Sequence, residues 1–348
     1  MEMNNKETRR VVIGITAHVD AGKTTLAEAM LYRTGQLRKL GRVDHGSAAM
    51  DSHLLERERG ITIFLSQAEL PLGDMEVTLL DTPGHVDFSA EMERTLSVLD
   101  YAILVISGVD GVQAHTRTLW RLLELYRVPT FLFVTKMDFG RRDRDCLMES
   151  LRHELGEGCV DFTPAARDRR MEQLATCRED ALEAYLDTGM VPEELVRQLV
   201  RQRLVFPCWF GSGLKLEGID EFLEGLARYV EPPAYPAAFS ARVFKISHDA
   251  QGKRLTHLKV TGGTLRVRDA ISYGGRQEKA AQLRIYTGGR FRPVDQVPAG
   301  GICAVQGLTA TWGGQGLGER EEAVRPVLEP VMRYRMALPP DCDSRVLL

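Results

Sequence analysis

The sequence of 348 residues predicts an α/β fold with a mostly parallel sheet, followed by a small antiparallel β-barrel domain. In the first two thirds of the chain, apolar β-branched runs alternate with helical patterns, which is typical of parallel sheets covered by helices. Three prolines in residues 231–236 (EPPAYP) then indicate a linker. Beyond it, short alternating runs separated by glycine pairs favour a barrel.

The composition excludes several classes of protein. A hydrophobic content of 44% and a charged content of 27% are close to those of soluble globular chains and argue against a disordered, collagen-like or coiled-coil protein. No apolar run approaches the roughly 18–20 residues that a membrane span needs, and the N-terminal segment lacks the apolar core of a secretion signal. We therefore expect a cytoplasmic protein whose six cysteines, which have no metal-ligand spacing, are free buried thiols.

Apolar runs are expected to form the strands of the first domain, at residues 10–16, 75–80, 102–107, 130–135 and 205–210. Helical patterns separate these runs, and the helix after the first strand is expected to end at Gly35. Residues 141–204 interrupt the alternation with a charged, mostly helical insertion, and a helix at 218–229 completes the domain.

These elements predict a first domain at residues 1–232, with its insertion at about 141–204, and a barrel domain at 237–326. Barrel strands are expected at residues 239–246, 254–263 and 281–286. An apolar run at 330–338 predicts a further strand, so residues 327–348 are interpreted as the start of a truncated third domain.

The net charge of −3 conceals an uneven distribution of charge. Residues 239–293 carry twelve Lys or Arg side chains against three acids, a formal charge of +9, whereas the remaining residues carry −12. A basic module of this kind favours contact with nucleic-acid phosphates, with a solvated basic face as the alternative. The segment has no clear stacking aromatics, so we expect recognition of phosphates and shape rather than of bases.

Residues 17–24 (AHVDAGKT) match the phosphate-loop pattern G-x-x-x-x-G-K-[ST], with Ala17 in the place of the first glycine. The loop follows a predicted strand and precedes a predicted helix, as the motif requires. Small residues let backbone N–H groups wrap around phosphates, and the helix N-terminus adds its dipole. We expect Lys23 to reach the β- and γ-phosphates and the Thr24 hydroxyl to bind Mg²⁺.

Further motifs supply the rest of a nucleotide site. Asp81, in DTPGH at the end of a strand, is expected to hold Mg²⁺ through water, and Gly84 to offer its N–H to the γ-phosphate. Thr62, in RGITI, is expected to complete the metal shell. Asp138, in TKMD, can accept hydrogen bonds from the N1–H and 2-amino groups of guanine, which adenine does not offer. The triplet SGL at 212–214 is expected to donate a backbone N–H to the base oxygen, although alone it is compatible with any loop.

Five motifs in this order resemble the translational GTPases, and AHVDAGKTT, RGITI and DTPGH are similar to elongation factor G and its relatives. Residues 41–63 and 95–113 resemble the tetracycline-resistance ribosomal protection proteins in particular. The resemblance extends from about residue 10 to about residue 330. It implies a GTPase that is stimulated by the ribosome and uses GTP, GDP and Mg²⁺. We expect a monomer whose partner is the ribosome rather than DNA or a membrane.

The resemblance also implies roles for single residues. His85 would position the water that attacks the γ-phosphate, Val19 and Ile61 would form an apolar gate, and Asp20 would help to hold a cation. The implied nucleotide site comprises Ala17, His18, Val19, Asp20, Ala21, Gly22, Lys23, Thr24, Thr25, Asp81, Thr82, Pro83, Gly84, His85, Thr135, Lys136, Met137, Asp138, Ser212, Gly213 and Leu214. The implied Mg²⁺ ligands are Thr24, Thr62 and, through water, Asp81.

Two positions depart from the family pattern. Thr135 stands where asparagine is usual, which we expect to weaken a hydrogen bond between the base and the phosphate loop. Gly213 stands where alanine is usual, which we expect to matter little because the backbone makes the contact.

Two other functions stay open. One is an elongation factor G paralogue or release-factor-like GTPase without a drug role, and the other is a GTP-binding fragment without productive turnover. The segments LGRVDHG and GLGEREE favour the protection type. The family's further domains are not in this sequence, which favours the fragment, and we expect the chain to bind GTP without restoring translation in the presence of tetracycline.

Overall fold

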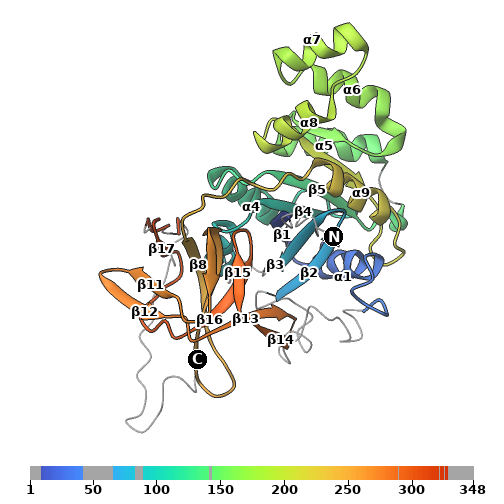
Figure 1. Ribbon diagram of the computed structural model, residues 1–348. Helices are drawn as coiled ribbons and strands as arrows, with labels where there is room; N and C mark the ends of the chain where they lie inside the picture. Colours follow the sequence, from blue (N-terminus) through green and yellow to red (C-terminus); the bar gives the residue numbers. More distant parts are fainter. Residues whose placement is uncertain are drawn as a thin grey trace, which may run out of the picture.

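The computed structural model describes residues 9–41, 66–82, 89–140, 143–288, 290–320, 322–324 and 326–327. It contains an α/β domain and a β-domain, which are joined by an extended segment (Figure 1). Several expected features lie outside the described residues, namely the RGITI motif, residues 83–85 of DTPGH and the strand at 330–338. No helix in the described part of the chain is long and apolar enough to cross a membrane.

The α/β domain is built on a seven-stranded sheet in the order β2-β3-β1-β4-β5-β7-β6. Its strands are β1 (Arg9–Ala17), β2 (Ser66–Leu72), β3 (Met75–Asp81), β4 (Tyr101–Ser107), β5 (Thr130–Thr135), β6 (Cys159–Asp161) and β7 (Phe206–Phe210). Every neighbouring pair is parallel except β2 with β3, so the predicted fold class is confirmed. The sequence pattern did not indicate β2, because Glu69 and Pro71 interrupt its apolar run, and proline is tolerated on such an edge strand.

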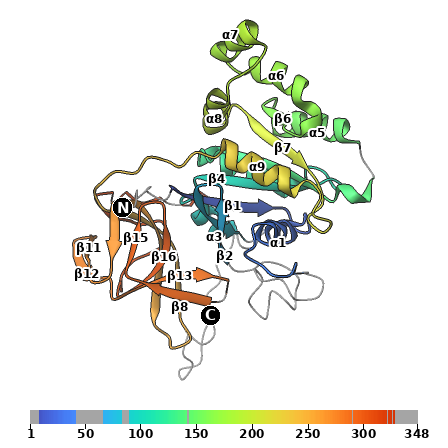
Figure 2. The same cartoon turned by 45° about the vertical axis from the view of Figure 1, so that its right-hand side comes forward.

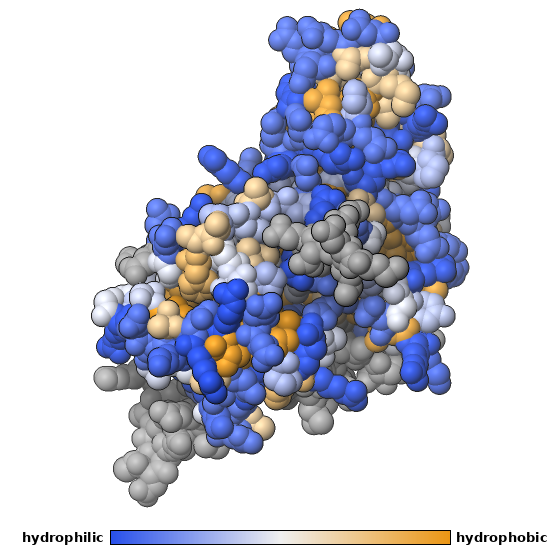
Figure 3. Space-filling view, in the orientation of Figure 1, coloured by the Kyte–Doolittle hydropathy of each residue, from blue (hydrophilic) through white to orange (hydrophobic). Residues whose placement is uncertain are grey.

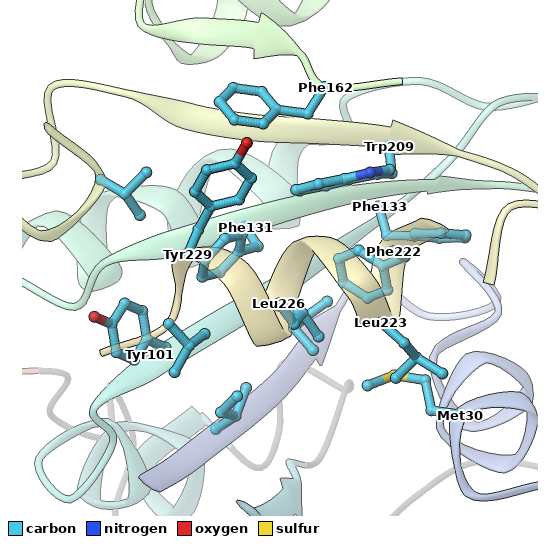
Figure 4. Packing of buried hydrophobic residues seen from close by; sticks show 14 of the residues in the cluster. Met30, Tyr101, Phe131, Phe133, Phe162, Trp209, Phe222, Leu223, Leu226 and Tyr229 are labelled. Atoms are coloured by element: carbon cyan, nitrogen blue, oxygen red, sulfur yellow. The ribbon is translucent and has the colours of Figure 1, made fainter. Parts of the chain in front are cut away.

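Helices cover both faces of the sheet. They are α1 (Lys23–Arg33), α3 (Ser89–Leu96), α4 (Ala114–Leu125), α5 (Arg144–Leu155) and α9 (Ile219–Tyr229). Side chains of α1 and α9 belong to one buried apolar cluster, and those of α3, α4 and α5 belong to a second one. Figure 4 shows α9 directing Phe222 and Leu226 toward aromatic side chains of the sheet, and the Phe222 ring lies 4.9 Å from that of Phe133. The strands that carry the loop motifs are therefore fixed by packing on both sides.

The insertion projects beyond the sheet (Figure 2). Besides α5, it contains η4 (Pro164–Ala166), α6 (Arg167–Ala175), α7 (Glu179–Thr188) and α8 (Glu193–Arg201). Residues 143–204, the described part of the insertion, are thus mostly helical, but they also supply β6, which extends the sheet by pairing with β7. Three residues are too few to show a strand period, so the sequence did not reveal this strand. Apolar surface lies on the projection in Figure 3, where Leu182, Leu186 and Met190 are exposed.

The second domain is entirely antiparallel in its described strands, as predicted. Its strands are β8 (Ser240–His248), β9 (Arg254–Gly262), β10 (Thr264–Arg266), β11 (Ala270–Tyr273), β12 (Arg276–Lys279), β13 (Gln282–Thr287), β14 (Arg290–Val294), β15 (Gln296–Pro298), β16 (Ile302–Gln306) and β17 (Gly316–Gly318). Six of them form a sheet in the order β14-β13-β16-β9-β8-β17, and β10-β15 and β11-β12 form two small sheets. The rings of Phe244, His257, Tyr286 and Phe291 lie in a row of contacts that the sequence pattern did not indicate.

The two domains share a small apolar core. Val12, Leu80 and Val98 of the α/β domain pack with Phe244 and Ile302 of the second domain. All five side chains are almost completely buried. The contact places the basic sheet against the strands that end in the phosphate loop and in Asp81.

Candidate functional site

The phosphate loop connects the end of β1 to the start of α1. Gly22 precedes the helix with φ at 89°, and Asp20 has φ at 61°. Both angles lie in the left-handed region, which glycine adopts without a steric cost. The turn is closed by a hydrogen bond from the Ala21 N–H to the His18 carbonyl at 3.2 Å. A short turn leading into a helix N-terminus is the geometry that presents N–H groups to an anion.

Lys23 and Asp81 form a buried ion pair beside this loop. Lys23 begins α1, and Asp81 ends β3, in register with Ile15 of β1. The next residue, Thr82, donates its hydroxyl to the Ile15 carbonyl at 2.8 Å, which fixes the end of β3 against β1. Thr24, the next residue of α1, is also buried. Two buried charges of opposite sign need each other as partners, so the loop holds an ammonium next to a carboxylate.

Thr135 links the end of β5 to the phosphate loop. Its hydroxyl lies 2.5 Å from the Ala21 carbonyl and 3.2 Å from the Ile106 carbonyl. Its own carbonyl accepts the Gly108 N–H at 2.8 Å. We expected threonine in place of asparagine to weaken a link between base and phosphate loop; the structure shows that the hydroxyl still reaches the loop.

Asp138 lies just beyond Thr135, in the short helix η3 (Met137–Phe139). Lys136 adopts φ of 61° ahead of this turn, and the Met137 N–H donates to the Gly211 carbonyl at 3.1 Å. The Asp138 carboxylate is 11% exposed and lies 3.9 Å from the exposed ammonium of Lys215. This lysine is the first residue after the SGL triplet, and no sequence signal connected it with Asp138.

The SGL triplet packs against the start of α1. A Cβ added to Gly213 would lie 3.1 Å from the Thr25 carbonyl oxygen, so the two backbones approach closely. Ser212 exchanges backbone hydrogen bonds of 3.0 Å with Glu217, and Leu214 is exposed at the tip of the loop. Glycine at this position therefore avoids a close contact between a side chain and the backbone of α1. The sequence indicated only a backbone hydrogen bond from this loop and did not reveal the close approach.

The same loops identify a known family. The family model described as "Elongation factor Tu GTP binding domain" matches residues 8–232. The chain belongs to this GTP-binding domain family. The model "Elongation factor G domain 2" matches residues 238–317. The resemblance to elongation factor G-like GTPases is thereby confirmed.

Relatives of this family member carry names that refer to drug resistance. The oxytetracycline resistance protein of Streptomyces rimosus is 39% identical over 334 residues, which cover 85% of this chain and 50% of that protein. The tetracycline resistance protein TetW of Butyrivibrio fibrisolvens is 35% identical over 312 residues, covering 83% of this chain and 48% of that protein. A crystal structure of a Thermus thermophilus protein matches with a TM-score of 0.81 and 26% identity, covering 91% of this chain and 55% of that one. The chain spans about half the length of the curated relatives that it matches.

The other predicted site residues of this GTP-binding domain differ from one another in burial and in their neighbours. Val19 is half-buried and Asp20 is exposed on the phosphate loop. The His18 ring lies 6.1 Å from the His115 ring of α4, a neighbour that the sequence did not indicate. The predicted residues outside the described ranges are Ile61, Thr62, Pro83, Gly84 and His85.

Proposed function

We propose that this chain binds guanine nucleotides and hydrolyses GTP when the ribosome stimulates it, as a factor of the tetracycline-resistance ribosomal protection type. The observation that carries the proposal is the convergence of three loops on the phosphate loop: Asp81 pairs with Lys23, Thr135 bonds Ala21, and Gly213 abuts Thr25. One loop supplies a metal-binding acid, and the others form the base site around Asp138. A nucleotide bound at the N-terminus of α1 would contact all three loops.

Phosphate binding would rearrange the buried ion pair. A γ-phosphate offers Lys23 a stronger set of acceptors than one carboxylate, which frees Asp81 to orient the water ligands of a cation. A group of three or more His, Cys, Asp or Glu side chains suited to a metal is absent from the described residues. The Thr24 hydroxyl and the Asp81 carboxylate fit Mg²⁺, which binds through one or two protein oxygens, phosphates and water. Mg²⁺ bound by Thr24 and Asp81 would neutralise charge on the β- and γ-phosphates.

Hydrolysis itself rests on residues that the resemblance implies. His85 would orient the attacking water, and Val19 and Ile61 would restrict its approach until the ribosome triggers the reaction. Asp20, exposed at the loop, is available to a cation near the phosphates. Thr62 and Gly84 would sense the γ-phosphate, so that two loops order with GTP and relax with GDP.

The charge of the second domain supports a ribosomal RNA partner. Residues 239–293 carry +9, and counterion release favours binding of such a surface to RNA phosphates. The names of the relatives favour a role in tetracycline resistance over that of an elongation factor G paralogue. A ribosomal partner places the proposed activity in the cytoplasm. We propose that the protein acts there as a monomer.

The test is nucleotide binding followed by turnover. Fluorescent GDP should bind and should be displaced by GTP but not by ATP, and the rate of GTP hydrolysis should rise when 70S ribosomes are added. Lys23→Ala should abolish both signals. Nucleotide binding without stimulation would support the alternative of a binding protein without productive turnover, and absence of binding would overturn the proposal.

A further inference from the structure

An open pocket of about 620 Å³ lies at the edge of the sheet opposite the phosphate loop, beside the starts of β5 and β7. The nucleotide motifs, in contrast, follow the ends of the strands. Arg127, Arg201 and Arg203 line this pocket, which we call the arginine pocket, and Glu124 is the one acid among the described residues that line it. The lining side chains carry a formal charge of +2, whereas the chain outside residues 239–293 carries −12.

Two of these arginines have an uncommon backbone conformation. The helices α4 and α8 end in turns of the same kind, and the residue after each turn's cap, Arg127 or Arg203, has φ of 53° or 60°. Glycine is usual at this position because a Cβ is strained in the left-handed region. Two arginines that accept this strain beside one pocket indicate that their side chains serve a purpose that glycine could not.

Arg203 is held rigidly at the wall of the pocket. Its guanidinium lies 5.2 Å from the centre of the Trp120 ring and 5.0 Å from that of Phe206. Its Nη1 donates to the Thr130 hydroxyl at 3.0 Å. Burial lowers the pKa of Arg203, and the charge of Glu124 partly offsets this effect. These contacts fix the cation, while its Nε and Nη2 donate to no other described residue.

The packing does not account for the other two arginines. Arg127 is exposed, and its side chain makes no hydrogen bond or ion pair with another described residue. Arg201 is also exposed, and it contacts Glu231 only at 3.8 Å. An arginine after a helix can serve only the last carbonyl groups. Two exposed cations beside a fixed one, however, also leave donors that an anion can use.

We propose that the arginine pocket binds phosphate groups, with Arg203 as the fixed donor and Arg127 and Arg201 closing on the anion. The planar guanidinium donates two parallel hydrogen bonds to phosphate oxygens. A phosphate group offers more acceptor oxygens than a carboxylate and can carry two negative charges, which matches the +2 of the lining side chains. A free polyphosphate and the backbone of RNA share this chemistry. The site is separate from the nucleotide site and does not depend on the proposed GTPase function.

The experiment is calorimetric titration of the full chain, saturated with GDP, with inorganic pyrophosphate and with a twelve-nucleotide oligo(U) RNA. Arg127→Gln should weaken binding of the preferred probe roughly 5- to 12-fold, the loss expected for one partly solvated hydrogen bond to a charged group. Arg121→Gln is the matched control, because it removes the same charge from an exposed arginine of α4 outside the pocket. It should leave both affinities unchanged. Tighter binding of pyrophosphate assigns the site to free polyphosphates, and tighter binding of oligo(U) assigns it to RNA.

A second variant separates ligand binding from capping of α4. Arg127→Gly should weaken the same probe to the same extent, yet its denaturation midpoint should be equal to or higher than that of the unaltered chain, since glycine adopts this φ without strain. An arginine that served only the helix would give the opposite result, a lower midpoint with unchanged affinity, and would overturn the proposal.

The remaining controls concern the nucleotide site and the chemistry of the ligand. Lys23→Ala should bind pyrophosphate at the arginine pocket as the unaltered chain does, so failure of GDP binding reports on the proposed function alone. The proposal is also overturned if Arg121→Gln is as harmful as Arg127→Gln. Tighter binding of a peptide of seven glutamates than of either phosphate probe would overturn it as well, because it would indicate an acidic protein partner.

Discussion

Lys259 and Asp100 form an ion pair of 2.6 Å across the interface of the two domains, with side chains only 4% and 10% exposed. The Lys259 ammonium also donates to the Val98 carbonyl at 3.0 Å. The second oxygen of Asp100 accepts the Val12 N–H at 2.8 Å, and the hydroxyl of Tyr235, in the linker, lies 3.4 Å from the same oxygen. The carboxylate of Asp100 therefore connects β1, the linker region and the second domain in one buried network.

Breaking this network should destabilise the protein strongly. Lys259→Met leaves a buried carboxylate without its cation, and the loss of one partner of such a pair costs about 3–5 kcal/mol. Chemical denaturation should show this loss. Arg201→Met, which breaks an exposed pair with Glu231, should cost less than about 1 kcal/mol. Equal effects of the two substitutions would contradict a buried role for Lys259.

Removal of the Thr135 hydroxyl should weaken nucleotide binding. Thr135→Val keeps the shape of the side chain but leaves the Ala21 carbonyl without this donor, and one such hydrogen bond contributes about 0.5–1.5 kcal/mol. Titration with fluorescent GDP should therefore show an affinity lower by roughly 2- to 13-fold. Thr135→Ser is the matched control and should bind normally. An unchanged affinity in the valine variant would mean that the loop does not depend on this link.

Asp138→Asn should shift base preference from guanine to xanthine. The carboxylate only accepts hydrogen bonds, whereas an amide can also donate to the oxygen that xanthine carries in place of the 2-amino group of guanine. Competition binding with GDP, XDP and ADP measures the preference. Lys215→Met removes the neighbouring charge and should preserve the choice of guanine. If the asparagine variant still prefers GDP, the base is bound elsewhere.

His85→Ala should separate binding from turnover. The residue follows DTPG, beside the expected γ-phosphate position, and one group that positions the attacking water contributes roughly 10²–10⁴ in rate. GDP affinity should stay close to that of the unaltered chain, while hydrolysis in the presence of 70S ribosomes should fall by this factor. Full stimulated turnover in the alanine variant would remove His85 from the mechanism.

Much of the fold was accessible from local patterns. The strands that end in Ala17, Asp81 and Thr135 are apolar runs next to polar motifs, and parallel strands bring their carboxyl ends to one edge of a sheet. The motifs could therefore be assigned to one site before any contact was known. The antiparallel second domain followed in the same way from alternating runs and glycine pairs.

Other features were decided only by tertiary contacts. Strands β2 and β6 are edge strands, and their pairing with β3 and β7 depends on partners distant in sequence rather than on their own weak patterns. Lys259 is one of twelve basic residues in its segment, yet it is buried because Asp100 lies opposite. The close approach of Gly213 to Thr25 and the row of rings ending at Phe291 likewise join separate segments. Sequence periodicity encodes which face of an element is apolar, whereas the partner of a charge or a ring is set by the packing of the whole chain.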